Sequence, residues 1–279
     1  MPHASDRGPA PQAFRPAPLR SYGGRHPRDR TGPAEDTPDV ERTIPMPSVL
    51  FVLTGARHWT LQDGSEHPTG FWAEELAAPY DRFEQAGWDI AVATPGAVVP
   101  VVDEASLGEM GGSEEETAAL RARLEELAPV LSAPQDLHEV DGQAHDVVFY
   151  PGGHGPMEDL AVDAGSGALL RERVAEGKPV ALLCHAPAAA LAAELDDDAG
   201  PGPFHGRRMT GFSNVEEQQA GLAEKAPWLL EDRLKEIGAE YEKAAEPWAP
   251  HVVVDGPVYT GQNPASSAAL ADRLLTDLG

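Results

Sequence analysis

The most constraining feature of this sequence is a series of short apolar segments, most of which stop at a glycine or proline turn. Near-continuous apolar runs of about 4–8 residues are typical of strands that are buried on both faces. We therefore expect strands at residues 48–53, 89–93, 144–150, 180–183, 207–210, 251–254 and 257–260.

Helical segments lie between these runs, at residues 71–86, 113–127, 167–175, 185–195, 228–237 and 266–278. One of them opens with Ser113 and Glu116, which have the spacing of a capping box. Strands that alternate with helices indicate a mostly parallel sheet with helices on both faces and right-handed crossovers. The predicted fold class is thus α/β, a three-layer sandwich.

The chain divides into two regions of different composition. Its first 44 residues hold seven Arg, six Asp or Glu and eight Pro, with few apolar residues. Such a segment cannot bury enough apolar surface to offset its ordering entropy, so residues 1–46 are predicted to be a disordered extension. No Pro/Gly/Ser linker interrupts the rest, and residues 47–279 are predicted to be a single domain.

Charge and cysteine content exclude several classes of protein. The chain has 279 residues, one cysteine and a formal net charge of −25. One cysteine excludes an internal disulfide framework and a Cys-based zinc site. The negative charge argues against nucleic-acid binding and against attraction to anionic membranes. Because the sequence shows neither an apolar run long enough to span a bilayer nor a signal peptide, we expect a cytoplasmic protein.

The apolar run 180–183 ends directly at Cys184 and His185, and a helix is predicted to follow at once. This is the pattern of a strand-to-helix elbow, in which a nucleophile stands on a tight turn above the sheet. A helix N-terminus favours a thiolate, so we expect an exposed, ionised sulfur with His185 as its proton partner. A lone cysteine is more often a small buried hydrophobe, but the elbow and the neighbouring histidine favour chemistry.

A glycine-rich turn, residues 152–155, follows the predicted strand 144–150. Its backbone N–H groups can form an oxyanion hole near the sulfur. A phosphate-binding loop is the rival interpretation, but the Lys-Ser/Thr of a P-loop is missing. His154 within this turn either points at the site or caps the turn.

Two adjacent carboxylates, Glu74 and Glu75, open the predicted helix 71–86, beside Trp72. Acidic residues in a first helical turn usually complement the helix dipole, and spacing alone does not choose between these two. Trp72 can line the pocket, whereas Trp228 and Trp248 are interpreted as core or interface residues.

Several separated motifs together resemble the PfpI-type superfamily of class I glutamine amidotransferase-like proteins. This group includes intracellular proteases, protein deglycases and heat-shock chaperones, and the combination resembles its glyoxalase III branch. The resemblance implies a flavodoxin-like, class I glutamine amidotransferase-like fold. It spans about residues 47–279, and the motifs that carry it are residues 74–76, 86–88, 152–155, 184–187, 210–217 and 260–264.

The resemblance also implies roles for individual residues. Cys184 matches the nucleophile, His185 its general base or acid partner, and Glu75 the family's glutamate. The acidic residue that orients the histidine matches Glu217, although the alignment also permits Glu216.

The remaining site residues are expected around the nucleophile. Gly153 matches the residue whose N–H lines the oxyanion hole, and His154, Ala186 and Trp72 are expected to bind substrate. Ala186 stands where the family usually has glycine. The histidine and glutamate cluster that binds a metal in some relatives has no clear counterpart, so we predict neither a metal nor another cofactor. The resemblance allows a homodimer.

These residues lead to one hypothesis and three alternatives. The hypothesis is conversion of methylglyoxal or glyoxal to lactate or glycolate through a cysteine hemithioacetal, without a cofactor and with protein deglycase activity as an extension. The first alternative is a cysteine amidohydrolase or peptidase that uses the same Cys-His site. The others are a holding chaperone and an oxidative-stress sensor with an oxidisable thiol.

Overall fold

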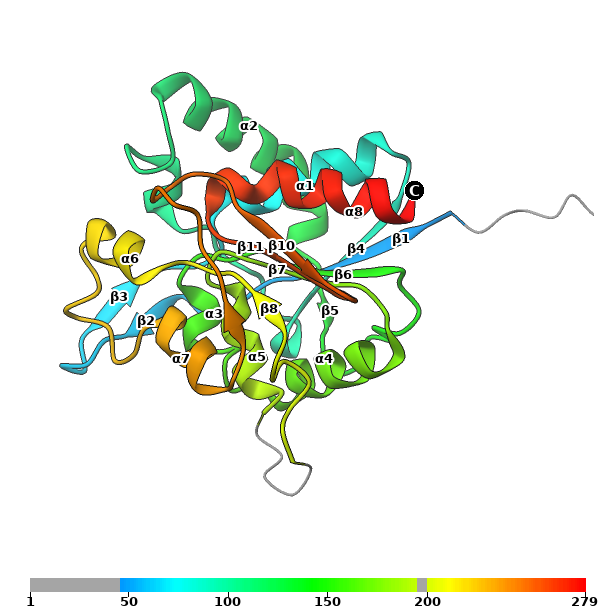
Figure 1. Ribbon diagram of the computed structural model, residues 1–279. Helices are drawn as coiled ribbons and strands as arrows, with labels where there is room; N and C mark the ends of the chain where they lie inside the picture. Colours follow the sequence, from blue (N-terminus) through cyan, green and yellow to red (C-terminus); the bar gives the residue numbers. More distant parts are fainter. Residues whose placement is uncertain (1–45, 195–199) are drawn as a thin grey trace, which may run out of the picture. The chain divides into compact units, whose positions relative to one another are not determined.

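The computed structural model describes residues 46–194 and 200–279 (Figure 1). The described residues belong to one compact unit. Residues 1–45 of the predicted extension lie outside the described range, so the predicted boundary between extension and domain stays a prediction. Within the described part, no helix has both the length and the apolar character needed to cross a bilayer.

The centre of the fold is a seven-stranded sheet with the order β10-β11-β7-β6-β1-β4-β5. Its pairs are parallel except that β10 runs antiparallel to β11 at one edge. Three of the inner strands, residues Val147–Tyr150, Val180–Leu183 and Val258–Gly261, are fully buried. The strands are β1 (Ser48–Val52), β4 (Asp89–Thr94), β5 (Gln135–Asp136), β6 (Val147–Tyr150), β7 (Val180–Leu183), β10 (Val252–Asp255) and β11 (Val258–Gly261).

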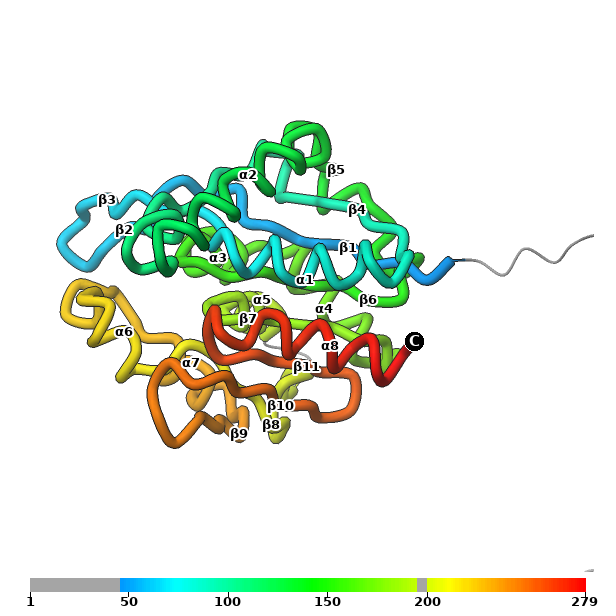
Figure 2. The backbone as a smooth tube through the Cα atoms, turned by 90° about the horizontal axis from the view of Figure 1, so that it is seen from above, coloured from blue at the N-terminus to red at the C-terminus, as the bar shows by residue number. Residues whose placement is uncertain are grey.

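Helices cover both faces of this sheet, as Figures 1 and 2 show. One face carries α1 (Ala73–Gln85), α2 (Glu114–Leu131) and α8 (Ser267–Leu278). The other carries α3 (Gly155–Glu158), α4 (Ala164–Glu176), α5 (Ala189–Ala192) and α7 (Leu230–Glu236). The predicted three-layer α/β sandwich is confirmed. Single 3₁₀ turns are η1 (Pro95–Ala97), η2 (Glu104–Leu107), η3 (Ala186–Ala188) and η4 (Pro264–Ser266).

Side-chain caps explain where three of the described α-helices begin: Ser113 caps α2, Asp163 caps α4, and Ser213 caps a third helix described below. The capping box at Ser113 and Glu116 is present at the start of α2. That helix nevertheless runs four residues beyond its predicted end, through Pro129 in its last turn. The predicted helix 185–195 is shorter in the described residues: it consists of η3 followed by the single turn α5.

Smaller elements lie outside the seven-stranded sheet, and the apolar pattern predicts only one of them. They are the hairpin β2 (His58–Thr60) and β3 (Glu66–Pro68), the pair β8 (Arg208–Met209) and β9 (Glu240–Tyr241), and α6 (Asn214–Ala220). Of these only β8 lies in a predicted strand, residues 207–210. The helix α6 begins with a second capping box, formed by Ser213 and Glu216. That serine-to-glutamate spacing is visible in the sequence and was a signal for this helix.

Candidate active site

Cys184 stands at the end of β7 in a backbone conformation that non-glycine residues rarely adopt. Its φ is +59°, in the left-handed region. Two long-range backbone bonds hold it there: its N–H donates to the carbonyl of Gly261, and its carbonyl accepts from the N–H of Phe212, both at 2.8 Å. Strain of this kind persists only where the surroundings over-determine it, and it concentrates at functional sites. The predicted elbow is therefore present.

The sulfur is buried, however, and the expectation of an exposed thiol is wrong. Cys184 is 3 % exposed and lies against a small, partly open cavity of about 20 Å³. A volume of this size accommodates about one water molecule. Segments distant in sequence close over the elbow and make this cavity. Its walls are Trp72, Met110, Gly153, His154, Cys184, His185, Phe212, Ala220, Trp248 and Pro264.

Glu75 is the carboxyl that reaches the sulfur. It is fully buried in the first turn of α1 and accepts a hydrogen bond from the Gly152 N–H at 2.7 Å, while its Oε1 has no hydrogen-bond partner among the described residues. Burial raises its pKa to about 8, although interactions with Cys184 and the Gly152 N–H oppose this rise. At pH 7 the carboxyl is therefore neutral and can donate a proton.

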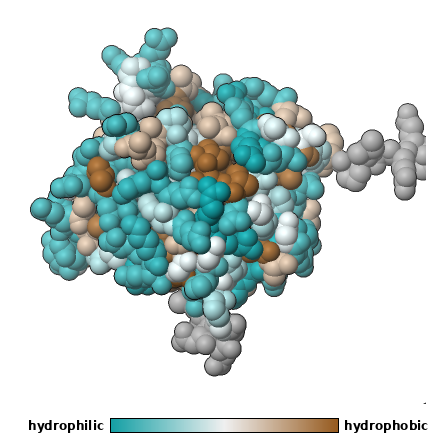
Figure 3. Space-filling model, viewed as in Figure 1, coloured by the Kyte–Doolittle hydropathy of each residue, from teal (hydrophilic) through white to brown (hydrophobic). Residues whose placement is uncertain are grey.

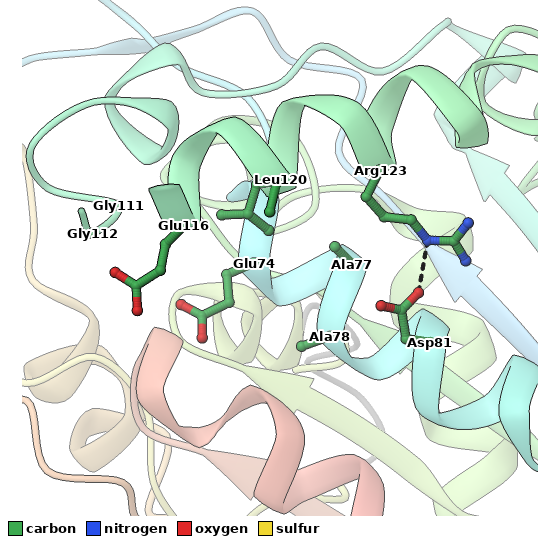
Figure 4. Close-up of a pocket in the computed structure, with 10 residues that line it drawn as sticks. Glu74, Ala77, Ala78, Asp81, Gly111, Gly112, Glu116, Leu120 and Arg123 are labelled. Atoms are coloured by element: carbon green, nitrogen blue, oxygen red, sulfur yellow. Dashed lines mark hydrogen bonds and ion pairs between the residues drawn. The ribbon is translucent and has the colours of Figure 1, made fainter. Parts of the chain in front are cut away.

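Glu74 lies elsewhere. Figure 4 shows it beside Glu116, in a separate pocket of about 410 Å³ between α1 and α2. Successive helical residues point about 100° apart, so only one of the two carboxylates can face the sulfur. The structure places Glu75 in that position.

The thiol is also neutral at rest. Burial and then the Glu75 carboxyl raise the pKa of Cys184 well above its ordinary value, while a hydrogen bond from the Gly153 N–H lowers it. The predicted helix dipole adds little, because only the 3₁₀ turn η3 and one turn of α5 follow the elbow. The expectation of a resting thiolate is thus wrong, and the sulfur must lose its proton as it reacts.

An acceptor for that proton lies next to the sulfur. The Nδ1 atom of His185 is 3.3 Å from Cys184 Sγ, and its Nε2 is 2.8 Å from Glu217 Oε2. Burial, and secondarily His154, lower the pKa of His185 to about 4 despite the attraction of Glu217. The ring is therefore neutral. Because a carboxylate only accepts, the proton sits on Nε2 and leaves Nδ1 free to take another.

Glu217 binds two imidazoles at once. Its other oxygen, Oε1, is 2.9 Å from Nε2 of His154. Burial opposes ionisation of Glu217, but His185 and His154 together hold its pKa below its usual range. His154 in turn stacks on Trp59 of β2, with ring centroids 5.1 Å apart. His154 thus points into the site, and it orders the carboxylate that orients His185.

The other predicted residues lie as follows. Trp72 precedes α1, lines the cavity and donates its backbone N–H to the Gly152 carbonyl at 3.0 Å. Ala186 is buried in the turn behind His185 and is not among the residues that line the cavity. Glu216, the alternative partner for the histidine, bonds instead to Gln262 and Asn263.

Sequence reasoning missed five residues that line the cavity: Met110, Phe212, Ala220, Trp248 and Pro264. The Phe212 ring lies 4.3 Å from that of His185 and belongs to a motif that was quoted without a role for this residue. Trp248, interpreted as a core or interface residue, is 39 % exposed at the cavity. Neither Met110 nor Trp248 lies in a patterned segment, so no local signal marked them.

Within the described residues, one group of side chains is arranged so that it could hold a metal ion. Ligand atoms of His154, His185 and Glu217 lie within 4.8 Å of one another. Both Nε2 atoms already bond to the carboxylate, so the group is complete without an ion. That the chain uses no metal stays a prediction.

Gly152 allows the closest approach in the site. A Cβ there would lie 2.5 Å from the Leu183 carbonyl oxygen, 2.7 Å from Glu75 Oε2 and 2.8 Å from the His185 N. We expect Gly152→Ala to lower the free energy of unfolding by about 1–3 kcal/mol. We also expect kcat/KM to fall roughly 10- to 100-fold for whatever substrate the site turns over, because Glu75 and the elbow are pushed apart.

Denaturant unfolding and steady-state kinetics check this expectation. Gly108→Ala is the matched control, because the nearest atom to a Cβ at Gly108 is 3.6 Å away. Equal behaviour of the two variants would contradict it.

Comparisons with known proteins identify the family of this chain. The model of the DJ-1/PfpI family matches residues 68–277. The glutathione-independent glyoxalase HSP31 of Saccharomyces cerevisiae is 27 % identical over 234 residues, 82 % of this chain and 97 % of the yeast protein. The protein/nucleic acid deglycase HchA of Pseudomonas aeruginosa is 29 % identical over 203 residues, 69 % of this chain and 68 % of HchA.

A solved structure is similar over the same region. The crystal structure of glyoxalase III from Candida albicans has a TM-score of 0.71 at 25 % identity and covers 83 % of this chain and 97 % of that one. The family model, these relatives and the shared α/β architecture agree. The chain therefore belongs to the DJ-1/PfpI family, in the branch of HSP31, glyoxalase III and the HchA deglycase.

Proposed function

We propose that this chain is a cofactor-independent glyoxalase that converts methylglyoxal to lactate and glyoxal to glycolate. One observation carries the proposal: the Cys184 thiol and the neutral His185 imidazole line a single small cavity, and the neutral Glu75 carboxyl is buried behind the thiol. The relatives named glyoxalases support the reaction class. The negative charge of the chain disfavours anionic substrates and suits an uncharged dicarbonyl.

The first step forms the hemithioacetal. Sγ of Cys184 attacks the aldehyde carbon while Nδ1 of His185 takes the thiol proton, and Glu75 donates its proton to the aldehyde oxygen. The ionised Glu217 stabilises the resulting imidazolium. Donation by Glu75 is available because its pKa of about 8 keeps it protonated at neutral pH.

The second step moves hydrogen between the two carbons. The Glu75 carboxylate removes the C1 hydrogen, and His185 protonates the oxygen on C2, which gives an enediol. Glu75 then delivers its proton to C2 while the C1 hydroxyl proton passes to His185, which gives a thioester of the 2-hydroxy acid. A carboxylate with a raised pKa is a better base for this task than an ordinary glutamate.

Hydrolysis completes the cycle. Glu75 takes a proton from water as the oxygen attacks the thioester carbonyl, and His185 returns a proton to the departing sulfur. The 2-hydroxy acid loses its proton to solvent, so one dicarbonyl and one water give one 2-hydroxy carboxylate and one proton. The Gly153 N–H, which already contacts the sulfur, is in place to stabilise the oxyanion.

The alternative functions fit the site less well. A peptidase needs a long groove for an extended chain, whereas the described cavity beside Cys184 is a small pocket walled by Trp72, Phe212 and Trp248. An oxidative-stress sensor needs an accessible thiol of low pKa, whereas burial and Glu75 raise the pKa of Cys184. For a holding chaperone, Figure 3 shows hydrophobic residues on one face as small patches among hydrophilic ones. A holding chaperone would still protect unfolded client proteins from aggregation after Cys184→Ala.

A direct assay tests the proposal. The purified chain, treated with a metal chelator and without glutathione, should convert methylglyoxal to lactate. In ²H₂O the lactate should retain part of its C2 hydrogen from C1 of the substrate, because one buried carboxyl carries that hydrogen. No consumption of either dicarbonyl would refute the function. A product other than a 2-hydroxy acid would refute the mechanism.

A further inference from the structure

We propose that Trp248 is the specificity-determining residue of this site and that Glu216 positions it. Together they restrict Cys184 to free oxoaldehydes of two or three carbons and exclude aryl dicarbonyls and glycated side chains. This inference deepens the proposed glyoxalase function and rests on it for the natural substrate. The part that concerns access to the sulfur can be tested without any turnover.

The cavity must open before a substrate enters, because its volume of about 20 Å³ is that of about one water. Most of its walls cannot yield. Trp72, His154, His185 and Phe212 are each at most 8 % exposed and packed in the core. The exposed walls are Met110 at 54 % and Trp248 at 39 %. Met110 is a flexible, unbranched side chain that adapts to its neighbours. Trp248 is the rigid wall.

Trp248 is held in a strained conformation. Its φ is +65°, in the left-handed region that a tryptophan rarely enters. Its indole N–H donates to the side chain of Gln219 on α6, and its ring meets that of Phe212 edge-on, with centroids 5.4 Å apart. Phe212 in turn contacts the His185 ring. The indole thus forms the cavity wall next to Phe212, which separates it from the catalytic imidazole.

The strain is maintained by Glu216, whose carboxylate is completely buried. Its Oε1 accepts the Trp248 backbone N–H at 2.8 Å. The same carboxylate accepts from Gln262 and Asn263 and from the N–H and hydroxyl of Ser213.

The segment around Trp248 is tied to the same amides. Gln262 accepts the Ala244 N–H at 2.8 Å, and Asn263 donates to the Ala249 carbonyl at 3.0 Å. Both ends of the segment 244–249 are therefore fixed to the side chains that bind Glu216. Because Glu217, the next residue, orients His185, one turn of α6 positions both the catalytic histidine and the wall above it.

The size limit follows from this arrangement. A two- or three-carbon oxoaldehyde needs only a small displacement of Met110 and Trp248. A phenyl ring or a protein-linked sugar adduct needs the indole to leave, which breaks its bond to Gln219 and its contact with Phe212. We therefore expect wild type to discriminate strongly against bulky substituents, and the loss of the indole to remove that discrimination.

The test compares wild type with Trp248→Ala, using Val215→Ala as control, since Val215 is an equally exposed apolar residue of the neighbouring helix. Two matched pairs of probes differ by one ring: methylglyoxal against phenylglyoxal in turnover, and N-methylmaleimide against N-phenylmaleimide in alkylation. With one cysteine in the chain, the alkylation rate reports Cys184 alone. Two phenyl-to-methyl ratios are compared, one of kcat/KM for the glyoxals and one of the alkylation rate constants for the maleimides. Trp248→Ala should raise both ratios about tenfold or more. Val215→Ala should leave them unchanged.

Glu216 is tested through the same ratios. Glu216→Gln should raise them, and Glu216→Gln combined with Trp248→Ala should give the ratios of Trp248→Ala alone, because Glu216 acts through the indole. If Glu216→Gln does not fold, Gln219→Leu, a change at an exposed position, should give a smaller rise.

The outcomes separate the two proposals. Three results would overturn the role of Trp248. One is a Trp248→Ala variant whose phenyl-to-methyl ratios stay within twofold of the wild type. Another is a wild type that turns over phenylglyoxal as well as it does methylglyoxal. The third is failure of Trp248→Ala to react with either maleimide. If no variant consumes a dicarbonyl but the maleimide ratio rises, the glyoxalase function is wrong and the role of Trp248 at the cavity stands.

Discussion

Replacing Cys184 with serine is expected to reduce methylglyoxal conversion to background, a loss of kcat/KM on the order of 10⁴-fold or more. Serine has a similar size, and its hydroxyl can bond to His185 as the thiol does. A hydroxyl holds its proton far more tightly than a thiol, however. A histidine whose pKa is about 4 is too weak a base to activate it.

Rescue by another thiol is excluded because the chain has no second cysteine. Steady-state kinetics measure the loss, and mass spectrometry of the wild type quenched in acid should detect the 2-hydroxyacyl adduct on Cys184. The thermal unfolding midpoint of Cys184→Ser should stay close to that of the wild type, because the substitution conserves volume. Activity within tenfold of wild type would show that the sulfur is not the nucleophile.

The pattern of apolar residues and turns predicts the strands and turns that carry this site, because each of them depends on residues that are neighbours in the sequence. The strand Val180–Leu183 is a run of four apolar residues, and the chain turns where that run meets Cys184. The sheet edge then brings β6 and its glycine turn beside the elbow, since neighbouring parallel strands end at the same edge. The element types and the Cys184–His185 pair could thus be predicted from the sequence.

Burial of the sulfur could not be predicted in the same way. It depends on Phe212, Trp248 and Met110, which come from three segments far from the elbow in the sequence. Contacts from these three segments together decide whether solvent reaches the cysteine. None of the three residues belongs to a periodic apolar pattern that the sequence would reveal. The error about the thiol's ionisation followed from the error about its burial, because desolvation is the main cause of its raised pKa.

The choice between adjacent acidic residues shows the same limit. Glu74 and Glu75, like Glu216 and Glu217, differ by about 100° in helical phase, and only the phase decides which one faces the sulfur or the histidine. The phase depends on where each helix begins. For α6 the capping box of Ser213 and Glu216 determines it: Glu216 folds back on its own cap, and Glu217 points at His185.

Replacing Glu75 with glutamine is expected to lower kcat/KM about 10²- to 10⁴-fold while making the protein more stable at neutral and alkaline pH. The amide oxygen can still accept from the Gly152 N–H and the amide nitrogen can face Cys184, so the geometry is retained. What is lost is the proton carrier. In the wild type, kcat/KM should also fall as pH rises through about 8, when Glu75 loses the proton it donates, and this alkaline limb should be absent from the residual activity of Glu75→Gln.

The stability change has a definite sign. The pKa of Glu75 is about 8 in the folded chain and near its ordinary 4.5 when unfolded, so its favourable contribution is complete below about pH 4.5 and is lost as pH rises toward 8. Between these values the wild type should lose about 1.4 kcal/mol per pH unit relative to Glu75→Gln. Denaturant unfolding at pH 5, 6.5 and 8 measures this slope. Glu74→Gln is the control: burial raises the pKa of Glu74 too, but Glu74 is only partly buried and lies outside the site, so its slope should be smaller. A variant that is inactive and also destabilised at every pH would mean that Glu75 serves the fold. An inactive Glu75→Gln variant whose stability relative to the wild type increases with pH would mean something different. The buried carboxyl would then destabilise the fold and be retained for the proton that it transfers.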